Sequence, residues 1–328
     1  MSAAAAPSRV PWWLWPQVLC LDAPLVAVSW MAALAKSHHL HLQSSLYVGL
    51  GLVTWIVYVL DRTSDAVSGR LPAPMSARHA FCLRHHKLLL RVLVPMVAVY
   101  VVWLALTDVP QGLLIQGLGL CVAACIYLAT FAVTQGRLRV VMFGTAAIAG
   151  LVVVTMLPVP VKIRVWLSAM LIVAVVSALR AKPDEKLMAI MPKELAASLL
   201  FALGCSAGVH LWTPPEHGTF CLEVRWFWAL VLINLLVIQW CEQLHERPKE
   251  PRSWPVLLLL IGGLTCFSLQ ALLFEQAAAV RALALVTLMA VLADGLLLIM
   301  ARRLRPDLFH TLADLLLLLP LPLLWWWV

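Results

Sequence analysis

The chain has 328 residues, of which 63% are apolar and 12% are charged. Because an ordinary soluble domain carries roughly 25% charged residues, this composition excludes a water-soluble globule and indicates a protein embedded in lipid. The net charge of +8 then reflects the usual excess of Lys and Arg in cytoplasmic loops, and we expect no nucleic-acid partner.

Apolar runs long enough to cross a hydrocarbon core of about 30 Å recur along the whole chain. Strands are not expected, because these runs are apolar on every face and do not alternate. We therefore expect an all-α polytopic membrane protein in which residues 1–328 form a single membrane domain. The runs predict about eleven transmembrane helices, near residues 10–35, 45–61, 88–107, 112–133, 140–158, 161–180, 194–213, 224–242, 254–274, 279–301 and 308–328.

The basic residues predict how these helices are oriented. With a cytoplasmic N-terminus, 19 of the 24 Lys and Arg residues fall on the cytoplasmic side. The positive-inside rule favours this arrangement. We therefore expect a bacterial cytoplasmic (inner) membrane protein, surrounded by membrane lipids, with its C-terminus outside.

Two segments on the cytoplasmic side, 61–87 and 242–253, are predicted to be loops, and each opens with a pair of acids. The members of each pair are four residues apart, so they share one helical face and repel each other. Charged helix ends that pair with Arg247 or Lys249 are the simpler interpretation. The pairs are Asp61 with Asp65 and Glu242 with Glu246.

Paired carboxylates with basic residues nearby suit a phosphate ligand that carries Mg²⁺. Mg²⁺ takes hard oxygen ligands and is commonly held by one or two carboxylates together with substrate phosphates. Arg and Lys side chains neutralise the remaining phosphate charge. This hypothesis treats the two acid pairs as parts of one site.

The first acidic segment resembles a motif of the UbiA-type intramembrane prenyltransferases. Residues 58–65, YVLDRTSD, keep the Asp-Arg-x-x-Asp part of the family's NDxxDxxxD motif, and residues 242–246, EQLHE, lie where its DxxxD motif is expected. Residues 70–72 and 76–80 resemble the basic loop after the first motif. Residues 192–204 are similar to the segment that enters the helix before the second motif.

The resemblance also shows departures from the family pattern. Val57 and Tyr58 stand where the family has Asn and Asp, and both acids of the second motif are Glu. The resemblance implies a nine-helix core, so the segment 140–180 is interpreted as an inserted helical hairpin.

From this resemblance we expect transfer of an isoprenoid chain from its diphosphate to a lipophilic acceptor, with Mg²⁺ as cofactor. The implied catalytic and metal-binding residues are Asp61, Asp65, Glu242 and Glu246. The implied phosphate-binding residues are Arg62, Arg70, Arg139 and Lys193.

Other polar residues lie within the predicted helices. A carboxylate at such depth suggests a function by default, and Asp22 is a candidate for binding the acceptor or for an ordinary helix contact. Asn234 and Gln239 precede Glu242 and are candidates for lining the same cavity, with interhelical hydrogen bonding as the alternative. Asp294 and Asp314 are expected to pair with Arg302 or Arg303.

Two further hypotheses remain open. A catalytically inactive UbiA-like protein that binds an isoprenoid lipid or a partner protein is favoured by the missing leading acid. A transporter would use the intramembrane aspartates Asp22, Asp294 and Asp314 as proton or ion sites.

Overall fold

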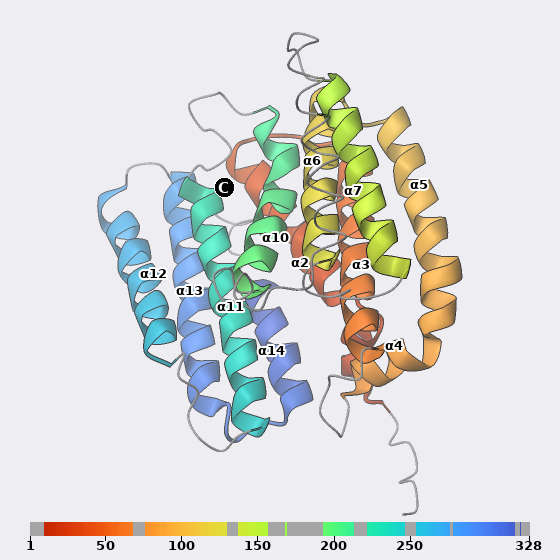
Figure 1. Ribbon diagram of the computed structural model, residues 1–328. Helices are drawn as coiled ribbons and strands as arrows, with labels where there is room; N and C mark the ends of the chain where they lie inside the picture. Colours follow the sequence, from red (N-terminus) through yellow and green to blue (C-terminus); the bar gives the residue numbers. More distant parts are fainter. Residues whose placement is uncertain are drawn as a thin grey trace, which may run out of the picture.

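A computed structural model describes residues 10–67, 76–129, 137–156, 168, 193–212, 222–246, 254–275, 278–318 and 322. All secondary structure elements in these residues are helical (Figure 1). They are η1 (Trp12–Leu14), α1 (Trp15–Val18), α2 (Asp22–Ser37), α3 (Ser44–Val67), α4 (Ala77–Leu88), η2 (Leu89–Leu93), α5 (Val94–Thr107), α6 (Gln111–Tyr127), α7 (Arg137–Met156), α10 (Lys193–His210), α11 (Leu222–Glu246), α12 (Trp254–Phe274), α13 (Ala278–Met300) and α14 (Pro306–Leu318).

The expected all-helical architecture is confirmed for the described residues. Five helical stretches are long and apolar enough to cross a membrane, and a sixth candidate consists of two helices joined at a sharp bend. The predicted helix at 161–180, and with it most of the expected insertion at 140–180, lies outside the described residues apart from residue 168. The first part of the expected insertion, residues 140–156, belongs to α7.

The outer faces of the bundle are strongly apolar. On α5, Val99 and Leu106 are 71% and 73% exposed, and on α12, Leu259 and Leu273 are 76% and 75% exposed. Extended apolar surfaces of this kind are rare on soluble monomers and mark contact with a protein or a membrane. The exposed faces therefore suit a membrane-embedded helical protein.

The first predicted helix is not continuous. Helices η1 and α1 meet α2 at an angle of 81° across residues 19–21, where Cys20 has a φ of 58°. Pro24 in the first turn of α2 has no amide N–H, which removes a backbone hydrogen bond at the break. Because of this break, Asp22 lies in the first turn of α2 and not in the middle of a helix.

Side chains of α3 stabilise the broken segment. The carbonyl of Gln17 accepts a hydrogen bond from Arg62 Nη1 at 3.3 Å, and the carbonyl of Leu19 accepts one from Trp55 Nε1 at 3.1 Å. In an apolar surrounding, backbone groups freed by a break need such partners. The bend is therefore held by hydrogen bonds from side chains of α3.

The segment 61–87 is mostly helical, contrary to the expected loop. Helix α3 continues through both acids to Val67, and α4 begins at Ala77. A π-helical turn, η2, joins α4 to α5 just before Pro95; such turns accommodate a missing backbone hydrogen bond. Figure 1 shows α4 running at an angle to α5, at the end of the bundle where α3 finishes.

The two largest apolar cores among the described residues both receive side chains from α10. The larger core contains Trp30, Phe227 and Leu283 and lies among α2, α10, α11, α12, α13 and α14. The smaller one contains Leu128 and Phe143 and lies among α3, α6 and α7, with residues of α10 packed against it. Helix α10 therefore connects the two halves seen in Figure 1, together with the packing of α2 against α3.

Candidate functional site

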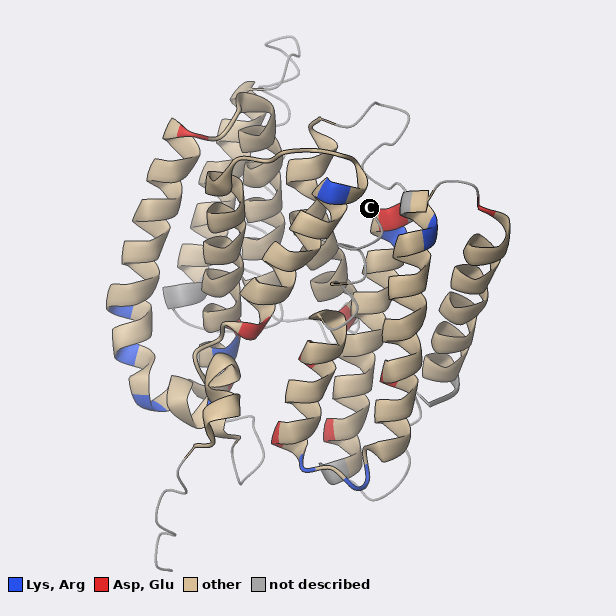
Figure 2. Ribbon diagram, turned by 180° about the vertical axis from the view of Figure 1, so that it is seen from behind, with Lys and Arg blue, Asp and Glu red and all other residues tan. Residues whose placement is uncertain are grey.

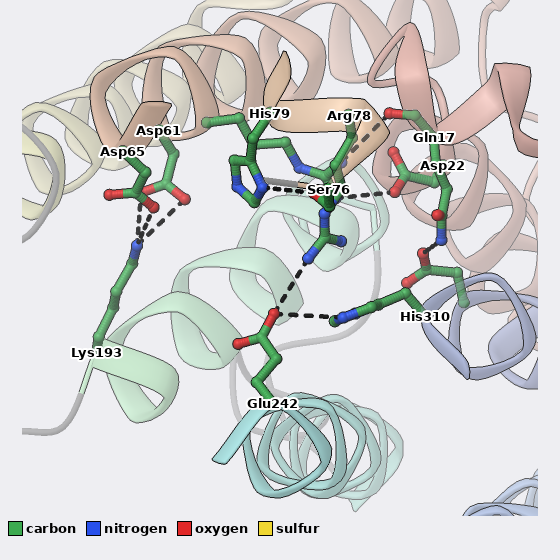
Figure 3. Close-up of polar contacts among 12 residues, drawn as sticks. Gln17, Asp22, Asp61, Asp65, Ser76, Arg78, His79, Lys193, Glu242 and His310 are labelled. Atoms are coloured by element: carbon green, nitrogen blue, oxygen red, sulfur yellow. Dashed lines mark hydrogen bonds and ion pairs between the residues drawn. The ribbon is translucent and has the colours of Figure 1, made fainter. Parts of the chain in front are cut away.

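The first acid pair converges on a single lysine. Lys193, the first residue of α10, places its Nζ 3.0 Å from Asp61 Oδ1 and 3.3 Å from Asp65 Oδ2 (Figure 3). The two carboxylates lie one turn apart on the same face of α3, as their spacing predicts. Their mutual repulsion is therefore compensated by an ammonium from a helix that is far away in the sequence.

The electrostatics of this group follow from its geometry. Burial alone would lower the pKa of Lys193, but the negative charges of Asp61 and Asp65 outweigh this effect and raise that pKa above its usual value. Lys193 is therefore charged at neutral pH. Its side chain keeps 33% of its surface exposed, so the ammonium is not sealed off from solvent or ligands.

Tyr127, near the C-terminal end of α6, belongs to the same group. Its hydroxyl is a hydrogen-bond partner of Asp61, and it also neighbours Asp65 and Glu194. The sequence offered only a weak signal for this residue, because a Tyr at the end of an apolar helix is usually an interfacial anchor.

Glu242 of the second acid pair is held by two bases from other helices. Its Oε1 lies 3.2 Å from Arg78 Nη2 of α4 and 3.3 Å from His310 Nε2 of α14 (Figure 3). The side chain of Glu242 is 45% exposed, whereas that of Arg78 is 11% exposed. Neither base was singled out as a partner from the sequence, because the contacts span separations of 164 and 68 residues.

The two acidic groups adjoin each other through α4. His79 accepts or donates a hydrogen bond with Ser76 at 2.7 Å, and it lies close enough to Arg78 and Lys193 for both charges to act on it. Figure 3 shows Arg78 and His79 on the side of the site that faces Lys193 and Glu242. Helix α4 therefore joins the acids of α3 to the acid of α11.

Arg62 does not lie where a phosphate-binding residue was expected. Its guanidinium is buried, contacts Asp22 Oδ2 at 3.1 Å, and lies 4.0 Å from the centroid of the Tyr58 ring. Tyr58 is a hydrogen-bond partner of both Arg62 and Asp22. Asp22 thus makes the helix contact that was the alternative to binding an acceptor, since Arg62 belongs to the neighbouring helix α3.

Asp314 and Asp294, the other acids within predicted transmembrane helices, form hydrogen bonds with neutral side chains. Asp314 Oδ2 accepts a hydrogen bond from Gln17 Nε2 at 2.8 Å, and Asp294 Oδ1 accepts one from Asn234 Nδ2 at 3.3 Å. These contacts differ from the expected pairing with the arginines at 302 and 303. The second amide hydrogen of Asn234 reaches the Ala313 carbonyl at 2.9 Å, so Asn234 makes the interhelical hydrogen bonds that were the alternative to lining a cavity.

Four more predicted site residues lie on or beyond the described helices. Arg70 lies outside the described residues, and the side chains of Arg139 and Glu246 are also outside them, although their backbones belong to α7 and α11. Gln239 is half-buried on α11.

The acid pair on α3 fits a ligand that brings its own Mg²⁺. Among the described residues, no group of three or more acids, histidines and cysteines is arranged to hold a metal alone. Mg²⁺ is more often bound by one or two carboxylates plus substrate phosphates, and Asp61 and Asp65 supply two that already converge on one cation. Glu242 fits less well, because Arg78 and His310 share its Oε1.

An open hollow of about 450 Å³ lies elsewhere, lined by Gln43, Ser44, Ser45, Thr107 and Asp108. It is at the beginning of α3, whereas Asp61 and Asp65 are near its end. This hollow is therefore separate from the candidate site.

Comparison of the chain with protein-family models, with curated proteins and with solved structures gives no match.

Proposed function

We propose that this protein is a UbiA-like intramembrane prenyltransferase, which transfers an isoprenoid chain from its diphosphate to a lipophilic acceptor. One observation carries the proposal. Carboxylates of α3 and α11 and bases of α4 and α10 come together at one end of the bundle, although they are far apart in the sequence. This mixture of acids and bases is what a magnesium diphosphate requires.

In this proposal Asp61 and Asp65 hold Mg²⁺, and Lys193 and Arg78 bind the phosphate oxygens. The bound metal would stabilise negative charge on the diphosphate as it leaves. Arg78 supports this role because its Nε is buried and has no hydrogen-bond partner among the described residues. Arg62 would act indirectly, by fixing the end of α3 against α2.

The distribution of charge supports a cytoplasmic location for the site. Figure 2 shows Lys and Arg mostly toward one end of the bundle and a smaller group at the other. Under the positive-inside rule the richer end faces the cytoplasm. The N-terminus would then be cytoplasmic, in a bacterial inner membrane.

A second candidate function is binding of an isoprenoid lipid or a partner protein without catalysis. It is favoured by the internal pairing of the acids, since Asp61, Asp65 and Glu242 each contact a base of the chain itself. Tyr58, which stands in place of a family acid, packs on Arg62 and not beside the acid pair. The broken first helix is the feature that a transporter would share, but the described residues hold one such break and not a matching pair.

The test compares purified wild-type protein in detergent with the double variant Asp61→Ala, Glu242→Ala. Lipid mass spectrometry identifies co-purified isoprenoids, and a non-hydrolysable geranylgeranyl diphosphate analogue measures Mg²⁺-dependent binding. We expect wild-type binding to need Mg²⁺ and the variant to lose it. Arg84→Ala, on an exposed position of α4, is the matched control.

Transfer activity separates the two candidates. If the protein is a prenyltransferase, incubation of the wild type with geranylgeranyl diphosphate and a lipid extract should release inorganic diphosphate. Binding of the analogue without release of inorganic diphosphate would favour the inactive protein. Wild-type binding of the analogue that does not depend on Mg²⁺ would refute both the proposed metal site and the proposed enzyme activity.

A further inference from the structure

Lys193 lies where a metal ion would have to bind. Its Nζ is within 3.3 Å of oxygens on both Asp61 and Asp65, including both oxygens of Asp61. A divalent cation bound by the same carboxylates would lie only a few ångströms from the ammonium, and the two positive charges would repel strongly at that distance. The acid pair therefore accommodates one cation at a time.

We propose that Lys193 and a divalent cation exchange at Asp61 and Asp65, and that the exchange requires an anionic phosphate group to receive the lysine. This inference rests on the proposed function, because it takes the same acid pair as the metal site. A divalent cation alone should bind weakly, since it must displace a charged partner. A cation that arrives together with diphosphate should bind tightly, since the displaced ammonium gains new oxygen partners.

The position of Lys193 allows this movement. It is the first residue of α10, and its flexible four-carbon stem carries three donors that can turn from one acceptor to another. Its side chain is one third exposed, so its ammonium can reach a ligand beside the pair. Arg62, the other base next to Asp61 in the sequence, cannot replace it because its guanidinium is buried against Asp22.

The exchange makes a prediction about coupling. Diphosphate and metal should each strengthen the binding of the other, because diphosphate attracts the Lys193 ammonium away from the acid pair and the metal releases that ammonium to the diphosphate. Removal of the ammonium should abolish most of this coupling, since the metal would no longer compete with Lys193 for Asp61 and Asp65.

The experiment measures Mn²⁺ binding by electron paramagnetic resonance on the full chain in detergent, with and without inorganic diphosphate at matched free Mn²⁺. In the wild type we expect diphosphate to tighten Mn²⁺ binding at least tenfold. In Lys193→Met we expect Mn²⁺ alone to bind at least tenfold more tightly than in the wild type, with less than threefold tightening by diphosphate. Asp61→Asn should lose both effects, and Arg84→Met should match the wild type.

Two results would overturn the exchange. One is wild-type Mn²⁺ binding that is as tight without diphosphate as with it, a measurement that needs no variant and so does not depend on how Lys193→Met folds. The other is equal tightening by diphosphate in the wild type and in Lys193→Met.

Failure of the exchange can be distinguished from failure of the proposed function. If Lys193 couples the binding of Mn²⁺ and diphosphate but geranylgeranyl diphosphate is never cleaved, the exchange is supported and the enzyme activity is refuted. If prenyl transfer occurs but the Lys193→Met variant binds Mn²⁺ as the wild type does, the enzyme activity is supported and the exchange is refuted.

Discussion

Removing the carboxylate of Asp22 should destabilise the protein strongly. The side chains of Arg62 and Asp22 are 6% and 4% exposed, so Asp22→Ala leaves a buried guanidinium without its charged partner. Breaking a buried ion pair in this way costs about 3–5 kcal/mol. Because an unfolded chain in a micelle finds other polar partners, we expect about 3 kcal/mol. Asp22→Asn keeps an acceptor oxygen for Arg62 but not the charge, so it should cost less than Asp22→Ala, about 2 kcal/mol.

The assay is unfolding by sodium dodecyl sulfate in mixed micelles, followed by circular dichroism. In the double variant Asp22→Ala, Arg62→Met the uncompensated charge is gone, so its loss of stability should fall short of the sum of the single losses by about 2 kcal/mol. Arg84→Ala should stay within about 0.5 kcal/mol of the wild type. Single and double variants that add within about 0.5 kcal/mol would refute the reasoning, because an ion pair that matters must show coupling.

Three further predictions concern the other polar groups. Glu242→Gln should change the unfolding free energy by less than about 1 kcal/mol, because solvent screens the ion pair of a side chain that is 45% exposed. It should strengthen diphosphate binding measured by calorimetry, because Arg78 loses its acidic partner, and weaker binding would contradict this. The pKa of Lys193 is raised in the folded protein. Its ion pairs with Asp61 and Asp65 therefore stabilise the fold fully below the usual pKa of 10.5, and this stabilisation is lost only as the pH rises through the raised pKa. The difference in melting temperature between wild type and Lys193→Met should therefore be constant from about pH 6 to 9, and a difference that fades in this range would contradict the raised pKa. Asn234→Leu should cost about 2 kcal/mol in the same unfolding assay, because it removes the donor to buried Asp294, and a neutral effect would show that Asp294 has another donor.

The helices and the acid pair on α3 were predictable because both depend on local periodicity. Apolar runs fixed the positions of the described spans to within several residues, and the spacing of Asp61 and Asp65 placed them on one helical face. Errors arose where helix ends carry polar residues. The chemical character of 61–67 suggested a loop, but α3 continues to Val67 because one face of these turns packs inward at Thr63 and Ala66.

The partners of the charged residues were not predictable in the same way. Arg62 follows Asp61 directly, and its position in the motif suggested a phosphate contact, yet it turns to Asp22, which is 40 residues away. This contact depends on the break in the first helix, which places Asp22 at the start of α2. No pattern within the sequence fixes that packing.

The internal ion pairs bear on the choice between an enzyme and a binding protein. An acid in an apolar bundle needs a partner whether or not it also serves a ligand, so the pairing of Asp22 with Arg62, both almost fully buried, is explained by folding alone. The pairing of Lys193 with Asp61 and Asp65 differs, because all three side chains keep part of their surface exposed. A purely structural contact gains nothing from that exposure, whereas a ligand site requires it. Since Lys193 is the first residue of α10, which contributes side chains to both of the larger apolar cores, a ligand that displaced its ammonium would act where the two cores meet.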